Sequence, residues 1–92
     1  MDQILRVLLL EDNAVDAELM LFELRQSGFA PHATRVDTES GYAAQLDAAL
    51  DLILADYSLP AFNAEQALAL LQSRHLDVPF IVIMSPGEID PA

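Results

Sequence analysis

The sequence predicts an α/β fold, a doubly wound parallel sheet of four strands with three helices on its faces. Short apolar runs of strand length alternate with longer segments in which apolar residues recur at helical spacing. This alternation gives the order β-α-β-α-β-α-β, in which every crossover helix returns the chain to the same end of the sheet. Polar residues typical of helix starts and ends separate these segments, so the apolar runs of strand length do not overlap the segments with helical spacing.

The first two strands and the helix between them are expected in the first 36 residues. Residues 4–10 form a nearly continuous apolar run, which predicts a strand buried on both faces. Asn13, with Asp16 three residues later, predicts the start of a helix over residues 14–27. Gly28 is placed to end that helix. A shorter, more polar strand near an edge of the sheet is expected over residues 32–36.

The second helix is expected to begin at Asp37 or Thr38, because both side chains can accept hydrogen bonds from the first helical N–H groups. Its apolar positions at helical spacing are Tyr42, Leu46 and Ala49.

The last three predicted elements follow from clear boundaries. Residues 52–55 form a third apolar strand that ends at Asp56. Asn63, with Gln66 three residues later, is typical of a capping box and predicts the start of a third helix. A proline stops this helix, and residues 80–84 form the fourth strand.

The first predicted helix carries two apolar lines on roughly opposite sides. One line consists of Val15, Leu19 and Phe22, and the other of Ala17, Leu21 and Leu24. Only one line can face the sheet. The other is either a set of ordinary exposed apolar residues or a surface for a partner.

The composition excludes several classes of function. Fifteen acidic residues face four Arg and no Lys, for a net charge of −11, which argues against direct binding to nucleic acid. The absence of Cys excludes disulfides, Cys-ligated zinc and thiol catalysis. No apolar run approaches the ~20 residues that a membrane span requires, and the N-terminus is not that of a secretory signal. We therefore expect one small cytoplasmic domain over residues 1–92, without membrane insertion.

Three of the predicted strands end next to residues whose side chains can bind a metal ion or react. Glu11 and Asp12 follow the first strand, Asp56 ends the third, and Ser85 follows the fourth. The carboxyl ends of parallel strands meet at one edge of the sheet, so the three carboxylates should converge there. They repel one another unless a cation is present, and hard oxygen ligands favour Mg²⁺. Asp56 could then act as a nucleophile toward a phosphoryl group.

Three sequence blocks together resemble the receiver domain of two-component response regulators. They are VLLLEDN at residues 7–13, DLILADYSLP at residues 51–60 and FIVIMS at residues 80–85. The loop after Asp56 and the third helix are similar to receivers of hybrid sensor histidine kinases. The resemblance implies a flavodoxin-like sheet of receiver type that is incomplete. Of the complete receiver fold, the chain would have four strands and three helices, and it would lack the fifth strand and the last two helices.

The same resemblance implies a role for individual residues. Asp56 corresponds to the phospho-acceptor, and Glu11 and Asp12 to the acidic pair that holds Mg²⁺. Ser58 would offer its backbone carbonyl to the metal, and Ser85 would be the switch hydroxyl that contacts the phosphoryl group. The chain would then be a signalling switch rather than a turnover enzyme. Its partner would be a sensor histidine kinase or a phosphotransfer domain.

Two departures from the family keep other functions open. The Lys that the family carries on its fifth strand has no counterpart, and Pro86 has no N–H to offer a phosphate. Both favour the alternative of a degenerate receiver-like interaction domain that is not phosphorylated. A third hypothesis, a Mg²⁺-dependent phosphotransfer or nuclease-like domain, calls for a second acid where Ser58 stands. A flavin site is excluded, because acids follow the first strand in place of a hydroxyl-rich loop.

The resemblance also predicts how two copies of the chain associate. It implies the strand order 2-1-3-4, which leaves the strand from Phe80 to Met84 at an edge with no charge and no proline. A homodimer through this edge or through the first-helix face is therefore expected.

Overall fold

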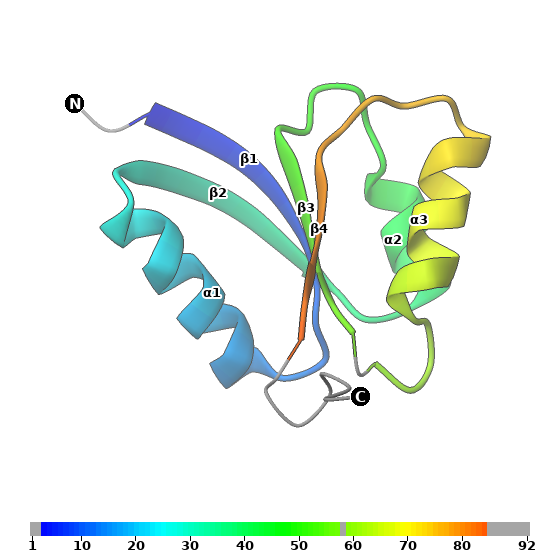
Figure 1. Ribbon diagram of the computed structural model, residues 1–92, viewed down its shortest axis with the longest axis horizontal. Helices are drawn as coiled ribbons and strands as arrows, with labels where there is room; N and C mark the ends of the chain where they lie inside the picture. Colours follow the sequence, from blue (N-terminus) through cyan, green and yellow to red (C-terminus); the bar gives the residue numbers. More distant parts are fainter. Residues whose placement is uncertain (1–2, 58, 85–92) are drawn as a thin grey trace, which may run out of the picture.

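The computed structural model of the chain describes residues 3–57 and 59–84. Within these residues strands and helices alternate in the expected order (Figure 1). The elements are β1 (Gln3–Leu10), α1 (Ala14–Gln26), β2 (Phe29–Val36), α2 (Glu39–Gln45), β3 (Leu52–Asp56), α3 (Ala64–Ser73) and β4 (Phe80–Ile83).

The four strands form one parallel sheet in the order β2-β1-β3-β4. β1 lies in the middle, where Leu10 aligns with Val36 of β2 on one side and with Ala55 of β3 on the other. β2 and β4 are the outer strands of the described part. The predicted fold class and the predicted place of β2 at an edge are confirmed.

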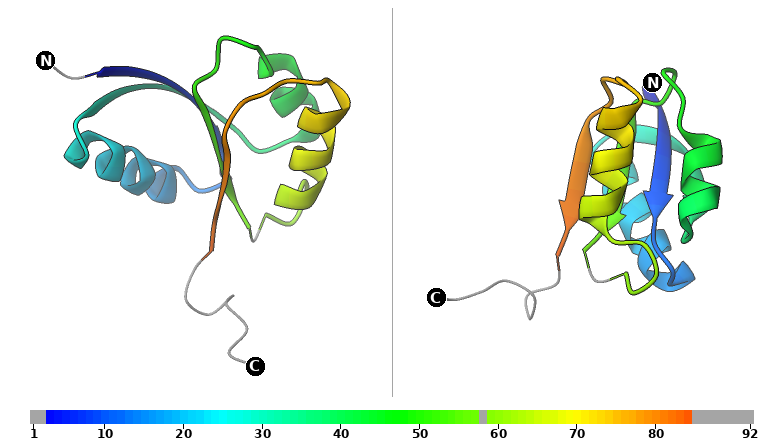
Figure 2. Two further views of the ribbon diagram at one scale, coloured as in Figure 1. Left: turned by 45° about the horizontal axis from the view of Figure 1, so that its top comes forward. Right: turned by 90° about the vertical axis from the view of Figure 1, so that its right-hand side faces the viewer.

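The helices lie in two layers on either side of the sheet. α1 covers one face, and α2 and α3 lie together on the other (Figure 2). Alternate strand residues therefore enter two separate cores. The core under α2 and α3 contains Leu8, Leu10, Tyr42, Ile53, Ala55, Leu59, Phe62, Ala64, Ala67, Leu71 and Val78. The core under α1 contains Val7, Leu9, Ala17, Leu21, Leu52 and Leu54.

Side-chain caps fix where the helices begin. Asn13 accepts hydrogen bonds from the N–H groups of Val15 and Asp16, at 2.8 and 3.1 Å. Asn63 and Gln66 form the predicted capping box, each side chain accepting from the backbone N–H of the other residue. These bonds satisfy helical N–H groups that have no partner within the helix.

The cap of α2 is Thr38, which accepts from the N–H of Gly41 at 3.1 Å. The expectation that this helix continues through Leu46 and Ala49 is wrong. It ends at Gln45, because Leu46 adopts an extended conformation with ψ of 126°. The Asp47 side chain then accepts a hydrogen bond from the Ala49 N–H at 2.7 Å, which stabilises a turn in place of a further helical turn.

The other boundaries shift by a few residues. β2 starts at Phe29 rather than at His32, since Gly28, with φ of +93°, turns the chain directly from α1 into the strand. β3 extends through Asp56, and β4 ends at Ile83 instead of Met84.

The two apolar lines of α1 have different environments. Ala17 and Leu21 are buried against the sheet, with Leu24 partly buried beside them. Val15, Leu19 and Phe22 are exposed. The prediction that only one line faces the sheet is confirmed, and the second line remains on the surface of the described part.

Candidate functional site

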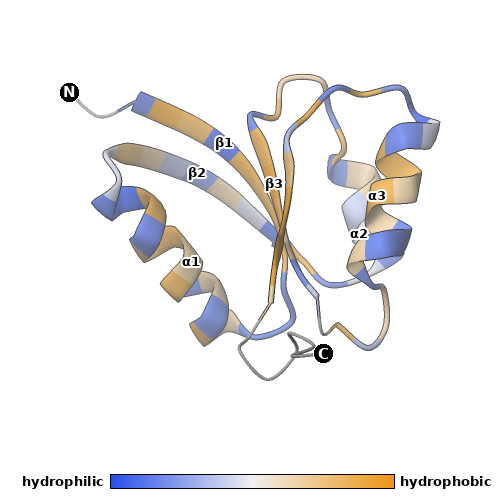
Figure 3. Ribbon diagram, viewed as in Figure 1, coloured by the Kyte–Doolittle hydropathy of each residue, from blue (hydrophilic) through white to orange (hydrophobic). Residues whose placement is uncertain are grey.

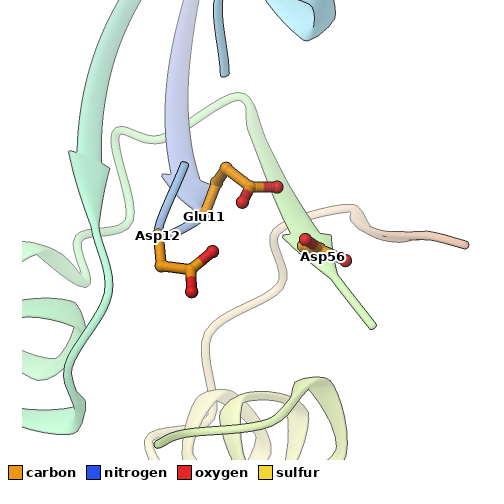
Figure 4. Close-up of side chains that lie close together, drawn as sticks. All are labelled: Glu11, Asp12 and Asp56. Carbon is orange, nitrogen blue, oxygen red and sulfur yellow. The ribbon is translucent and has the colours of Figure 1, made fainter. Parts of the chain in front are cut away.

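The three predicted acids meet at the carboxyl ends of β1 and β3 (Figure 4). Glu11 and Asp12 directly follow β1, and Asp56 is the last residue of β3. The parallel register aligns the ends of the two strands, so the side chains converge. One carboxylate oxygen from each residue lies within 4.8 Å of the other two. Glu11 is buried, Asp56 is half-buried and Asp12 is exposed, so the cluster opens toward solvent on the side of Asp12.

Glu11 is held in place by its backbone as well as its side chain. Its N–H donates to the Val36 carbonyl at 3.0 Å, and its own carbonyl accepts from Arg35 Nη1 at 3.2 Å. Oε1 accepts from the Asn13 N–H at 3.0 Å. Oε2 is buried and has no hydrogen-bond partner among the described residues.

Burial raises the pKa of Glu11 from its ordinary 4.5 to about 7. The Asn13 N–H bond opposes this rise in pKa, whereas the neighbouring carboxyl groups of Asp56 and Asp12 add to it. Only 1% of Glu11 is exposed, so water does little to stabilise the ionised form. A cation bound by the cluster would stabilise the ionised form of Glu11 in place of water.

The donor set fits a small hard cation. Three carboxylates offer oxygen ligands only, and Oε2 of Glu11 is a buried acceptor that no described group satisfies. Mg²⁺ binds through a few carboxylates and retains several waters, which the exposed side of the cluster allows. The residues present therefore suit Mg²⁺ better than zinc or copper, for which nitrogen or sulfur ligands are typical.

Two of the residues predicted for the site lie outside the described residues, namely Ser58 and Ser85. Tyr57 lies next to Asp56 and is 42% exposed. Its N–H donates to the Ile83 carbonyl at 2.9 Å, which ties the chain after β3 to the end of β4.

The sequence did not indicate Arg35 or the Asn13 N–H as supports for Glu11. The sequence indicates Asn13 only as the cap of α1, and its N–H bond to a side chain two residues earlier has no sequence signature. Arg35 reaches Glu11 because β2 pairs with β1, so only the sheet register reveals this contact.

Comparisons with known proteins give the site a context. No protein-family model matches the chain. It is 33% identical over 85 residues to the phosphate regulon transcriptional regulatory protein PhoB of Klebsiella pneumoniae. It is 29% identical over 86 residues to the transcriptional regulatory protein QseB of Haemophilus influenzae and, separately, to the cell cycle transcriptional regulator CtrA of Caulobacter vibrioides. These alignments cover 90–94% of the chain.

The chain is a relative of the response regulators. It spans only 37–38% of the length of these relatives. Among solved structures, the response regulator MaeR bound to beryllium trifluoride matches with a TM-score of 0.70 and 22% identity. That match covers 91% of the chain and 70% of MaeR and shows the fold. The resemblance to receivers and the flavodoxin-like arrangement, with four strands and three helices, are confirmed.

The three relatives are transcriptional regulators, and the solved neighbour is a response regulator. Within the described residues, no helix has both the length and the apolar character needed to cross a membrane.

Proposed function

We propose that the chain is a receiver module of two-component signalling that accepts a phosphoryl group on Asp56. The donor is the phosphohistidine of a sensor histidine kinase or a phosphotransfer domain, and the proposed location is the cytoplasm. The convergence of Glu11, Asp12 and Asp56 at the ends of β1 and β3 carries this proposal. The relationship to response regulators supports two-component signalling as the general process.

The proposed reaction is a transfer between two side chains. An oxygen of the Asp56 carboxylate attacks phosphorus, an acyl phosphate P–O bond forms, and the P–N bond to histidine breaks. The histidine nitrogen keeps the electron pair of the broken bond and takes up a proton. Bound Mg²⁺ would neutralise negative charge on the group in transfer. Glu11 and Asp12 would hold the ion with Asp56. The Ser58 carbonyl is proposed as a further ligand and the Ser85 hydroxyl as the group that contacts the phosphoryl oxygens.

Two absent donors set the expected rate. The chain contains no Lys, and Pro86 lacks an N–H. Removal of one preorganised donor to a developing negative charge costs ~2.7–4 kcal/mol, or about a hundredfold to a thousandfold in rate. Phosphorylation of Asp56 should therefore be slow or short-lived.

Mass spectrometry after incubation with acetyl phosphate and Mg²⁺ tests this function. We expect a small fraction of the chain to gain the mass of one phosphoryl group and Asp56→Ala to gain none. Asp37→Asn, which alters an exposed acid outside the cluster, is the matched control and should react like the unaltered chain. An adduct that survives Asp56→Ala contradicts the site, and a stable stoichiometric adduct contradicts the predicted loss of rate. If no adduct forms while Mg²⁺ still binds, the alternative of an unphosphorylated interaction domain is supported.

A Mg²⁺ titration followed by NMR tests the metal site separately. Amide signals near Tyr57 and Asn13 should shift with a weak dissociation constant, on the order of 10⁻³ M. Asp12→Asn should weaken binding, whereas Asp37→Asn should not. No shift at tens of millimolar Mg²⁺, far above that range, would exclude the proposed site.

The proposed partners follow from charge and from the open edge. Direct binding to nucleic acid is not proposed, because the net charge of −11 repels phosphates. Pairing of two copies along the edge of β4 remains a prediction, and its test is given in the Discussion.

A further inference from the structure

The peptide group between Glu11 and Asp12 joins two of the three acids in the cluster. It lies where β1 has just ended, and Figure 3 shows the largely hydrophobic β1 giving way to a hydrophilic loop before α1. Because a peptide group is planar, the direction of its carbonyl determines ψ of Glu11 and, with it, where the Cα of Asp12 lies. A donor that holds this carbonyl therefore also fixes the point from which the Asp12 side chain starts.

The regular hydrogen bonds of the sheet stop just before this peptide group. The Glu11 N–H donates to the Val36 carbonyl at 3.0 Å, but the last paired residues of β1 and β2 are Leu10 and Val36. The Glu11 carbonyl accordingly lies beyond the ladder. Arg35 supplies a donor for it, since Nη1 lies 3.2 Å from the carbonyl oxygen. A side chain of β2 thus continues the support that the β2 backbone no longer gives.

Three hydrogen bonds together fix Glu11 and leave one of its oxygens over. Its N–H, its carbonyl and its Oε1 are bonded to Val36, Arg35 and Asn13, respectively. Oε2 is buried and has no hydrogen-bond partner among the described residues. The carboxylate is turned toward Asp56 (Figure 4). The remaining acceptor is therefore held in place and available to an ion.

Arg35 acts on the cluster in two opposite ways. Its positive charge lies beside the acids and opposes the binding of a cation by repulsion. Because Arg35 is exposed, solvent and salt weaken this repulsion. Its bond to the Glu11 carbonyl, in contrast, orients the acids before the ion arrives. Groups that orient metal ligands without touching the metal typically account for about a tenfold to a hundredfold gain in affinity, so we expect the orienting effect to prevail.

We propose that Arg35 is a positioning residue of the metal site, which orients Glu11 and Asp12 for Mg²⁺ through its hydrogen bond to the carbonyl between them. Arg35 does not itself touch the ion, and it belongs to β2, a strand that contributes none of the three acids. The inference rests on the metal site of the proposed function. It does not require phosphorylation of Asp56.

A Mg²⁺ titration of Arg35→Met at constant ionic strength tests this role. The amide signals near Tyr57 and Asn13 again report binding. Met keeps an unbranched apolar chain but has neither a donor nor a charge, and we expect the dissociation constant to rise about tenfold. Loss of the positive charge alone would lower the dissociation constant, so the direction of the change separates the two effects. An unchanged or lowered dissociation constant overturns the inference.

Arg74→Met is the matched control. The Arg74 side chain makes a bond of the same kind, from Nη1 to the Ala43 carbonyl at 2.8 Å, but at the end of α3. This variant loses the same charge and a comparable hydrogen bond, and it should leave Mg²⁺ binding unchanged. Both Arg side chains are exposed, so the fold should persist in both variants, as far-ultraviolet circular dichroism can verify. An equal rise of the dissociation constant in both would mean a general effect of the substitution and overturns the inference.

A double variant shows whether Arg35 acts through Glu11. Glu11→Gln removes the carboxylate that the bond helps to orient, so adding Arg35→Met should then raise the dissociation constant by much less than tenfold. A full tenfold rise in this background overturns the inference. If the unaltered chain binds no Mg²⁺, the metal site itself is wrong and the role of Arg35 with it. If the unaltered chain and Arg35→Met bind equally, only the role of Arg35 is wrong.

Discussion

The two faces of the sheet differ in how they are covered, since α2 and α3 lie on one face and α1 on the other. On the face under α2 and α3, Ile53 and Leu8 are fully buried and join a continuous core with Tyr42. On the other face, α1 buries Leu9 and Leu54. At the outer strand β4 both faces are open, since Val82 on the first face is 40% exposed and Ile81 on the second is 48% exposed. Apolar strand residues therefore indicate only that a sheet face should be buried. The positions of the helices determine which of these residues are buried.

Substitutions of one aromatic residue on each face should show the largest difference. Tyr42 is fully buried, contacts Phe62 with ring centroids 5.3 Å apart and donates a hydrogen bond to the Ala67 carbonyl at 2.8 Å. Tyr42→Ala should lower the free energy of unfolding by about 3–5 kcal/mol. Phe22→Ala, at a 51% exposed position on α1, should change it by only about 0.5 kcal/mol. Urea denaturation of both variants gives the comparison, and similar losses would show that the α1 face is covered in solution.

The pH dependence of the free energy of unfolding tests the raised pKa of the buried Glu11. Because the pKa of Glu11 is about 7 in the folded chain and 4.5 ordinarily, the folded state binds more protons than the unfolded state between these values. The free energy of unfolding should therefore fall as pH rises from about 4.5 to about 7, by at most about 3 kcal/mol from this group. Urea denaturation at several pH values without Mg²⁺ measures it.

Two variants identify the group responsible for this pH dependence. Glu11→Gln should remove most of it, and Glu23→Gln, which alters an exposed acid on α1, should leave it unchanged. A slope that persists in Glu11→Gln would assign the titration to another group. Millimolar Mg²⁺ should flatten the slope in the unaltered chain, since the cation stabilises the ionised cluster.

Self-association should reveal whether the outer edge of β4 is open. The Ile83 carbonyl accepts from the Tyr57 N–H just after β3, so by the alternation of a parallel ladder the N–H and C=O groups of Val82 point to the other side of the strand. Two copies can pair there, although a four-residue strand buries little area and the net charge of −11 opposes contact. Weak dimers should therefore form as salt increases and screens the charge.

Sedimentation across ionic strength measures this association. Val82→Lys should abolish the dimers, because a charged edge resists pairing, whereas Leu68→Lys on α3 should not. A clean monomer at high protein and salt concentration would show that the edge is covered.

The smallest expected effect concerns the helix cap on the closed face. Asn63→Ala removes the side-chain acceptor of the Gln66 N–H and should cost about 1 kcal/mol. Asn63→Gly should cost only a few tenths of a kcal/mol relative to Asn. Thermal denaturation of the two variants resolves the difference, and equal costs would mean that the cap is not the source of stability.

Local signals predicted most of the fold. Asn13, Asn63 and Gln66 were recognised as caps because their hydrogen bonds join residues two or three positions apart. Ala17 and Leu21 were assigned to a common line because helical spacing alone sets it. The three acids were predicted to converge because parallel strands end at one edge of the sheet, and they do.

The sequence could not predict features that depend on contacts between distant segments. Glu11 is buried, and β2 brings Val36 and Arg35 to its backbone, but no local pattern marks either the burial or these contacts. The end of α2 was missed because Leu46 and Ala49 continue the helical spacing, while the Asp47 side chain stabilises a competing turn. The roles proposed for Ser58 and Ser85 stay predictions.

The central position of β1 has a consequence for the way the chain is made. Among the described elements β1 is synthesised first, yet it pairs with β2 on one side and with β3 on the other. While the ribosome extends the chain, β1 can pair with β2 as soon as α1 and β2 have emerged. Its second edge, which includes the apolar Val7–Leu10 stretch, has to wait for β3. The emerging chain therefore passes through a stage with an open apolar edge, at which chaperones or wrong strands compete with β3 for β1.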